Sequence, residues 1–212
     1  MSPVNRNRFP RVHALPPLIA ILLAVSPVAS AQNAELAAIH QADQSARSDP
    51  ATIDWTALAV EDAKRRERVV QLLRDGAVRS ATDYHHAAMI FQHGSTLEDI
   101  RLAHALATLA MSLEPGVQRH RWLVAASWDR MMTQQLQPQW YGTQFQGNRD
   151  GMFLYPVAEG AVSDEDRQAM HVPTLAEARA RLEELARTHG QGVHPRPPTI
   201  EQLREARLPA AE

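Results

Sequence analysis

Apolar residues recur with a helical period over most of the first two thirds of the chain, and short breaks that contain Gly or Pro separate the segments. An acidic residue stands three positions after Ser80, Ser95 and Thr174, which is the capping-box spacing that starts helices. The pattern therefore predicts helices over residues 34–47, 54–75, 80–93, 96–113, 117–135 and 174–189, a short helical turn at 163–170 and a last helix near 200–207.

The apolar faces of two helices indicate how they pack. In the 54–75 helix, the residues at near-helical spacing are Val60, Ala63, Val70 and Leu73, which predicts that they form its buried face. The 96–113 helix is apolar on two sides, a pattern typical of a central helix. Acids precede bases by three or four positions in the run 61–68, which predicts a solvated helix face.

A different pattern begins after Pro138. Residues 141–145 and 152–157 read as strands, and Gly and Asn within 146–151 supply the positive φ angles that a hairpin loop needs. An isolated hairpin is only marginally stable in water, so this one has to pack on the helices. The stretch 194–198 is a stiff Pro-rich segment, and we expect the tail that follows to be loosely attached.

Together these elements predict a mainly α fold, a compact array of antiparallel helical hairpins with one small β-hairpin appendage at about residues 142–157. Ala87-Ala88 and Ala125-Ala126 lie roughly one tetratricopeptide period apart, although the full repeat consensus is missing. The predicted organisation is a signal peptide at 1–31, an N-terminal helix and linker at 32–53, a helical domain at 54–190 and a Pro-rich tail at 191–212.

The N-terminal segment predicts export. Three Arg and no acid precede an apolar run, and Ala29-Ser30-Ala31 follows as a small-x-small cleavage site, so the segment reads as a secretory signal peptide. The alternative is a membrane anchor, but the apolar run is only about 15 residues, contains three Pro, and spanning needs roughly 20. We therefore expect a secreted protein of the periplasm of a Gram-negative bacterium, without a transmembrane segment after cleavage.

Composition excludes several function classes. The chain has no Cys, which excludes disulfides, iron–sulfur clusters and thiol nucleophiles. Cleavage after Ala31 removes three Arg and no acid, so the formal charge moves from −2 to −5. Such a chain lacks the basic excess that binds nucleic acid phosphates. Serine-nucleophile motifs and Gly-rich phosphate loops are missing from the sequence, and we expect no cofactor.

The most distinctive segment is Asp83 to Gly94. On the predicted helix Thr82, His86, Met89 and His93 share one face, which either faces solvent or lines a cleft closed by the hairpin or the C-terminal helix. His86 and His93 lie roughly 10.5 Å apart along the axis at 1.5 Å per residue, whereas zinc needs each nitrogen at about 2.0–2.1 Å. The spacing therefore disfavours a metal site, for which His93 and His104 would be the starting ligands.

Further candidate residues lie on the next two helices and the hairpin. His104 neighbours apolar positions, which favours a hydrogen-bonded core histidine. Arg121, Asp129 and Arg130 lie on the 117–135 helix and have two readings: Asp129 orients a histidine base, or these residues form an ion pair with another helix, and the ion pair is favoured. Gln144 in its short aromatic strand points either into a pocket or to water. The candidate binding residues are Arg121, Arg130, Gln144 and Tyr141, and the candidate catalytic residues are His86, His93, His104 and Asp129.

Four segments carry a resemblance to a known family. They read DYHHAAMIFQHG at 83–94, EDxxLAH at 98–104, RWLxAAxxDR at 121–130 and PQxYGTQF at 138–145. Together they resemble a bacterial family of unknown function whose members are secreted or lipid-anchored, over roughly residues 60–185. The resemblance implies a shared fold and marks His86, His93, His104, Arg121, Asp129 and Gln144 for testing. The chain departs from the family in its short Pro-rich tail and in lacking a lipid-anchor Cys.

Two functional hypotheses follow. The favoured one is a periplasmic binding or protein-interaction module, whose partner is a protein or a small molecule, because no complete catalytic signature is present. The alternative is a small His-based or metal-assisted hydrolase that uses the polar face around His86, His93 and His104. The sequence alone leaves open whether the protein is an enzyme.

Overall fold

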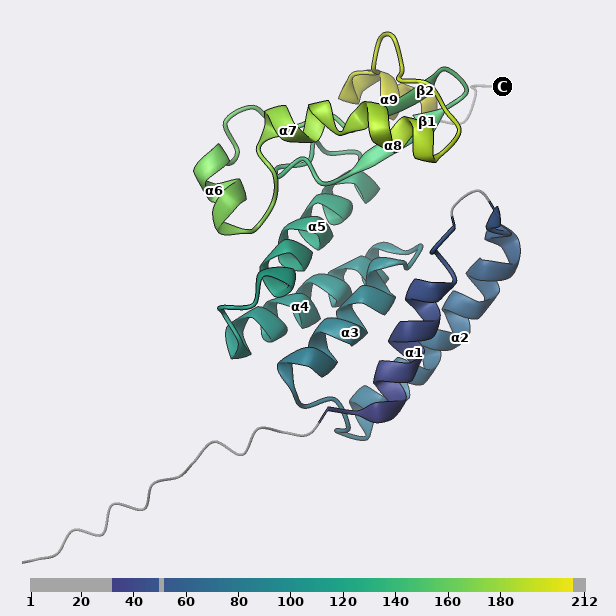
Figure 1. Cartoon of the computed structure of the whole chain (residues 1–212), viewed down its shortest axis with the longest axis vertical. Helices are drawn as coiled ribbons and strands as arrows, with labels where there is room; N and C mark the ends of the chain where they lie inside the picture. Colours follow the sequence, from purple (N-terminus) through teal and green to yellow (C-terminus); the bar gives the residue numbers. More distant parts are fainter. Residues whose placement is uncertain (1–31, 50–51, 208–212) are drawn as a thin grey trace, which may run out of the picture.

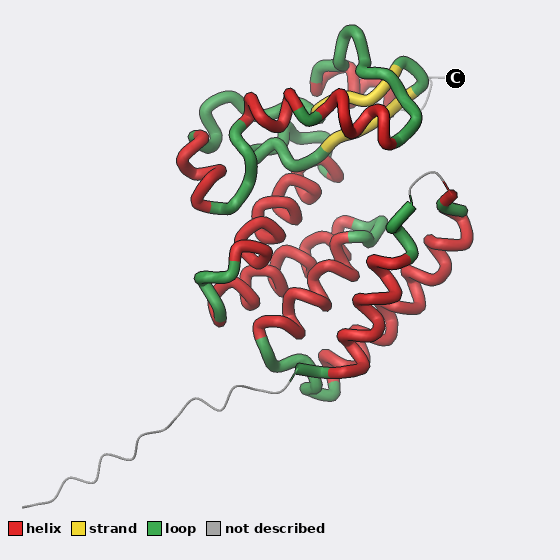
Figure 2. The backbone as a smooth tube through the Cα atoms, in the orientation of Figure 1, coloured by secondary structure: helices red, strands yellow, loops and turns green. Residues whose placement is uncertain are grey.

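A computed structural model describes residues 32–49 and 52–207, so the predicted signal peptide at 1–31 lies outside the described residues. The described chain has a layer of helices at one end and, at the other, a smaller part that holds the β-hairpin and the C-terminal helices (Figures 1 and 2). The predicted mainly α fold with a small β-hairpin is confirmed.

The helical layer contains five helices whose limits agree with the sequence pattern to within two residues. Side-chain caps begin four of them: Asn33, Asp54, Ser80 and Thr96 each accept a backbone N–H of the first turn. The predicted box at Ser95 is wrong by one residue, because Thr96 pairs with Asp99 instead. The helices are α1 (Ala34–Ser45), α2 (Trp55–Arg74), α3 (Ala81–Gln92), α4 (Leu97–Leu113) and α5 (Gln118–Gln134).

The central helix is α3 rather than α4. It packs against α1, α2, α4 and α5, and most of its residues are buried. On α4 the small-residue face, with Ala103, Ala107 and Ala110, is fully buried, whereas Leu109 and Leu113 are about half exposed. Small side chains let the backbones of neighbouring helices approach closely, so the alanine face, and not the leucine face, makes the tightest helix contacts.

The predicted core face of α2 is only partly right. Val70 and Leu73 are partly buried against the core, but Val60 is 54% exposed and Ala63 is exposed, and the fully buried residues are Leu58, Asp62, Val69 and Leu72. In the first half of the helix the buried face is therefore the one that carries Asp62, which pairs with Arg47 after the end of α1. That contact also corrects the prediction that the whole 61–68 run is solvated.

The smaller part is built around the hairpin. Strands β1 (Phe145–Asn148) and β2 (Gly151–Leu154) pair antiparallel, so the turn is shorter and later than predicted and centres on Arg149 and Asp150. The predicted 174–189 helix is divided at Arg181 into two. The helices of this part are α6 (Asp164–Ala169), α7 (Leu175–Ala180), α8 (Leu182–Thr188) and α9 (Ile200–Arg207).

The described part of the tail is attached to the rest of the molecule, which corrects the expectation of a loose tail. The backbone N–H of Met152 on β2 donates to the Gly192 carbonyl, and the N–H of His194 donates to the Met152 carbonyl, each at 2.8 Å. Arg204 and Arg207 on α9 donate to backbone carbonyls of Leu136 and Gln134 at the end of α5. The tail therefore joins the hairpin to the helical layer.

Asp129 connects α5 to the smaller part. Its carboxylate is completely buried and accepts the backbone N–H groups of Trp140, Tyr141 and Thr143 at 2.8–2.9 Å, as well as the Thr143 hydroxyl at 2.8 Å. Burial raises the pKa of Asp129 above its ordinary value, although these donors favour the charged form. One side chain thus satisfies the polar backbone of the loop that leads into the hairpin.

We predict that Asp129→Asn lowers the free energy of unfolding by about 1–3 kcal/mol, because the amide NH2 group cannot accept a backbone N–H and leaves buried donors unpaired. Chemical denaturation of the wild type and the variant measures the difference. The exposed Asp75→Asn is the matched control and should change the value by less than about 0.5 kcal/mol. Equal stability of the two variants would contradict the anchoring role.

Candidate functional site

The polar face predicted on α3 is partly covered by α1. His86 stacks on His40 of α1, with ring centroids 4.1 Å apart and planes 10° apart. At the C-terminal end of α3, His93 contacts Asp43 of α1. Thr82, His86, Met89 and His93 are all of intermediate exposure, so the face is only partly covered, and the element that lies over it is α1 rather than the hairpin or the C-terminal helix.

Four imidazoles form a cluster where α1, α3 and α5 meet. His85 lies 4.9 Å from His120 and 6.2 Å from His86, measured between ring centroids, and His120 is fully buried. Burial, with the nearby His120 and Arg119, lowers the pKa of His85 to about 3. Burial and the adjacent His40 lower the pKa of His86 to about 4. The cluster is therefore neutral near pH 7.

His104 and Gln144 both contact the backbone of α5. The Nδ1 atom of His104 lies 3.2 Å from the Val124 carbonyl oxygen and 3.1 Å from the Ser127 hydroxyl, as predicted for a hydrogen-bonded core histidine. Burial lowers its pKa, although the contact with Val124 opposes the shift. The side-chain amide of Gln144 donates to the Ala126 carbonyl at 3.3 Å. Neither residue lines the pocket described below.

The two predicted roles of Asp129 are wrong. Its oxygens bind the loop after α5, and among the residues described no Arg or His is bonded to it. Arg121 instead donates to the backbone carbonyls of Pro115 and Ala169. The backbone carbonyl of Tyr141 accepts a hydrogen bond from Nε of Arg167 at 3.0 Å. These residues stabilise the junction between the two parts of the molecule.

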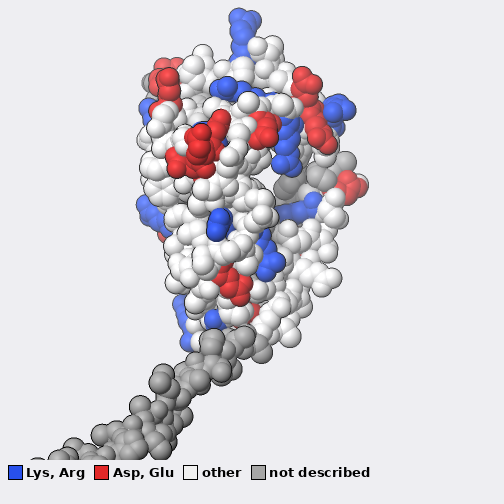
Figure 3. All heavy atoms as spheres, turned by 60° about the vertical axis from the view of Figure 1, so that its left-hand side comes forward, with Lys and Arg blue, Asp and Glu red and all other residues white. Residues whose placement is uncertain are grey.

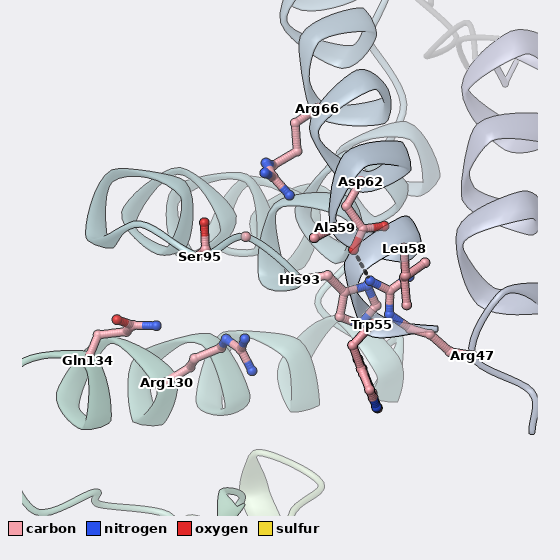
Figure 4. A pocket seen from close by; sticks show the side chains of 11 residues that line it. Arg47, Trp55, Leu58, Ala59, Asp62, Arg66, His93, Ser95, Arg130 and Gln134 are labelled. Carbon is pink, nitrogen blue, oxygen red and sulfur yellow. Dashed lines mark hydrogen bonds and ion pairs between the residues drawn. The ribbon is translucent and has the colours of Figure 1, made fainter. Parts of the chain in front are cut away.

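A pocket of about 550 Å³ lies between α2, the α3–α4 turn and the end of α5. Basic side chains border a hollow on the face shown in Figure 3. In the pocket, Arg66 from α2 and Arg130 from α5 point toward the space between their helices (Figure 4). The remaining lining residues are Arg47, Trp55, Leu58, Ala59, Asp62, His93, Gly94, Ser95 and Gln134.

Two of the three pocket arginines are paired with acids. Arg47 donates to Asp43 at 2.8 Å and also binds Asp62, and Arg66 lies 3.5 Å from Asp99. Arg130 differs, because its buried Nε has no hydrogen-bond partner and its guanidinium forms no ion pair with any described residue. Burial, with the charge of Arg47, lowers the pKa of Arg130. The pocket thus contains a cation whose counter-charge is missing from the described chain.

His93 is held by Asp43 at the edge of the same pocket. Its Nδ1 lies 3.0 and 3.1 Å from the two carboxylate oxygens of Asp43, a residue that is only 1% exposed. Burial raises the pKa of Asp43, but the stronger combined effect of His93, Arg47 and Gln44 lowers it, so the carboxylate is charged. An ionised acceptor at Nδ1 fixes the orientation of the ring.

Gly94 allows the chain to turn immediately after His93. A Cβ atom at this position would lie 2.2 Å from the Asp99 Cβ, so a larger residue would push the turn away from α4. The glycine therefore lets the backbone pass against the first turn of α4, where His93 and Ser95 both line the pocket.

Sequence reasoning singled out His93 and Arg130 but missed the residues that surround them. Asp43 and Arg47 are four positions apart on a predicted helix, which reads as an ordinary surface pair. Asp62 and Arg66 fall within the run interpreted as solvated. Asp62 is unusual because it is a carboxylate on the buried face of α2. The sequence does not show this, since it does not fix which face of α2 is buried.

The described residues, 32–49 and 52–207, contain no group of three or more His, Asp or Glu arranged to hold a metal ion. His93 contacts α1, whereas His104 contacts α5, so the two starting ligands considered from the sequence have different neighbours. The structure gives no support to the metal-assisted form of the hydrolase hypothesis.

A second pocket, of about 660 Å³, lies beside β2, α7 and α8. Two arginines line it. The buried Arg167 donates to the carbonyls of Tyr141, Trp140 and Val162 and to the carboxylate of Asp164, whereas Arg179 on α7 is exposed to solvent. The buried guanidinium of this pocket is therefore satisfied by the chain, unlike the partly buried guanidinium of Arg130.

The histidine cluster predicts a pH-dependent stability. The unfolded chain protonates His85 and His86 near the ordinary value of 6.5, whereas the folded protein does so only near 3 and 4. Below about pH 6.5 the unfolded state therefore binds more protons, so the free energy of unfolding falls as the pH decreases toward about 4. Denaturation curves at several pH values measure this slope.

The variant His86→Gln should reduce the slope, because it removes one of the titrating groups. The exposed His189→Gln, which lies outside the cluster, is the matched control. If both variants keep the slope of the wild type, the cluster is not the source of the pH dependence.

Comparisons of this chain with protein-family models, curated proteins and solved structures found no match. The resemblance based on the four sequence segments therefore stays a prediction. Within the described ranges, none of the helices combines the length and the apolar character needed to cross a bilayer.

Proposed function

We propose that this chain is an exported binding protein whose Arg130 pocket takes a small molecule with a carboxylate or phosphate group. The observation that carries the proposal is the guanidinium of Arg130, which lies in the pocket with a buried Nε and no partner among the described residues. The predicted signal peptide supports export to the periplasm.

The energetics of an unpaired cation support this proposal. A partly buried charge without a partner costs free energy, and proteins usually pair such groups or place them where a ligand completes them. An arginine fork is suited to a carboxylate or phosphate, because two parallel N–H groups bind two oxygens. An anion in the pocket would give Arg130 the acceptor that the chain itself does not supply.

The charges around the pocket also favour an anion. Arg47, Arg65, Arg66 and Arg130 oppose Asp43, Asp62 and Asp99, which leaves one positive charge in excess within this group. This excess is local, since the whole chain has a formal charge of −2. A positive pocket on an acidic protein concentrates anions at that site and repels them elsewhere.

Size and shape point to a small molecule. The volume of about 550 Å³ falls within the range of about 300–1,000 Å³ that is typical of ligand pockets. Leu58, Ala59 and Trp55 provide an apolar wall opposite the polar side chains of Arg130 and Gln134. The pocket therefore suits an anion that carries a small apolar group.

A protein partner is the second candidate. Leu109 and Leu113 lie four positions apart on α4 and are 47% and 55% exposed, and Trp122 on α5 is 37% exposed. Leu109 and Leu113 are neighbours on one face of the helix, and adjoining exposed apolar side chains are what a contact surface requires. The unpaired Arg130 has no role in this second proposal, so variants of Arg130 separate the two.

We predict that inorganic phosphate binds the wild type and that Arg130→Gln weakens the binding at least about tenfold, the effect of losing one charged hydrogen bond of about 1.5–3 kcal/mol. Isothermal titration calorimetry at constant ionic strength measures both affinities. The control is Arg149→Gln, whose side chain is 93% exposed in the hairpin turn and which should bind like the wild type.

When no ligand is bound in the pocket, Arg130 should lower the free energy of unfolding. We predict that Arg130→Met raises the free energy of unfolding by about 0.5–2 kcal/mol, because it removes an unpaired cation and keeps an apolar stem of similar length. Denaturation in chloride buffer, with and without phosphate, provides the measurement. A variant that is less stable than the wild type in chloride, or a wild type that does not bind phosphate, would overturn the proposal.

A further inference from the structure

His93 has one nitrogen bound and one free. Its Nδ1 is bonded to the buried carboxylate of Asp43, while its Nε2 has no hydrogen bond to the described chain and is not among the buried unpaired atoms. The side chain is 20% exposed and lines the Arg130 pocket. In a neutral ring whose Nδ1–H donates to a carboxylate, the lone pair is on Nε2, which is the atom available to the pocket.

This arrangement contains the parts of a general-base site. A base needs a fixed tautomer and orientation, which a buried carboxylate at the other ring nitrogen provides. The carboxylate of Asp43 is itself held by Arg47 at 2.8 Å and by the Gln44 amide at 2.8 Å. From the sequence, Asp129 is the candidate for this orienting role, but in the structure the carboxylate at the ring is that of Asp43, 50 positions before His93.

We propose that His93 is the general base of a hydrolytic site for small esters that carry a carboxylate or phosphate group. This inference rests on the proposed anion-binding function of the same pocket. Arg130 binds the anionic group of the substrate, and Asp43 acts as a positioning residue for His93. The site differs from the hydrolase considered from the sequence, because His86, His104 and Asp129 take no part in it.

The proposed reaction uses the ester, one water molecule and the imidazole of His93. The Nε2 lone pair accepts a proton from water while the water oxygen forms a bond to the ester carbonyl carbon and the C=O π pair moves to the carbonyl oxygen. When that pair returns to re-form the C=O bond, the bond from the carbon to the alcohol oxygen breaks, and the leaving oxygen takes the proton from Nε2. The ester and one water thus become an acid and an alcohol, and the imidazole returns to its neutral form.

Alkylation with bromoacetate tests the site without a guess at the natural substrate. The Nε2 lone pair attacks the methylene carbon, a C–N bond forms, the C–Br bond breaks, and bromide leaves. The chain has no Cys that would consume the reagent. We expect a single carboxymethyl group on Nε2 of His93, formed at least about tenfold faster than on the exposed His189 of the same sample, because the pocket concentrates the anionic reagent.

Matched reagents and variants separate the roles of the two residues. Bromoacetamide is neutral, so its rate at His93 relative to His189 should be lower than that of bromoacetate. Arg130→Gln should abolish the preference for bromoacetate but keep the rate with bromoacetamide. Phosphate should protect His93 from bromoacetate, and His93→Gln should remove the fast product altogether. Peptide mass spectrometry locates the label, and amino-acid analysis distinguishes the Nε2 from the Nδ1 product.

The outcomes distinguish this inference from the binding proposal. Labelling of His93 no faster than of His189 with either reagent, or labelling at Nδ1, overturns the role of His93 even if phosphate binds in calorimetry. If bromoacetate and bromoacetamide share one rate at His93 and phosphate does not bind, the anionic substrate and the proposed function both fail. Fast labelling at Nε2 that depends on Arg130 supports the general-base site.

Discussion

The arrangement of α1, α2 and α3 depends on one buried carboxylate, that of Asp43. It receives His93 from the end of α3 and Arg47 from the end of its own helix, and Arg47 continues to Asp62 on α2. A buried charge must be paired with good geometry or it destabilises the fold, so these contacts constrain the ends of α1 and α3 relative to each other and to the first half of α2. The Arg130 pocket lies against this network, which holds His93 and Arg47 in its wall.

The second constraint is the satisfaction of polar backbone after α5. Asp129 accepts three backbone N–H groups of the following loop, and Gln139 bonds to the backbone of Gln144 and Tyr155. A loop buried between two parts of a molecule has no water to satisfy its amides, so side chains must do so. Several of the residues marked by the sequence resemblance act here, in the junction of the fold, rather than in the pocket.

The two proposals draw on a contrast within the same group of arginines. Arg47, Arg65 and Arg167 have acceptors from the chain, and their role is structural. Arg130 has none among the described residues, although it is partly buried. The histidines differ in access to the pocket: His104 is bonded to α5, the unpaired ring nitrogens of His85, His86 and His120 are buried between helices, and His93 lines the pocket with no hydrogen-bond partner at Nε2 among the described residues. Function is assigned to the groups that the fold leaves incomplete.

The sequence by itself determined the limits of the first five helices to within two residues, the capping boxes at Ser80 and Thr174 and the presence of a hairpin, because these depend on contacts within a few positions of the chain. It also identified His104 as a core histidine from its apolar neighbours. Only the tertiary structure decided which face of α2 is buried, that α1 partly covers the polar face of α3, and that Asp43, rather than Asp129, holds a histidine. These contacts join residues up to 50 positions apart, and hydrophobic periodicity contains no information about which carboxylate meets which ring.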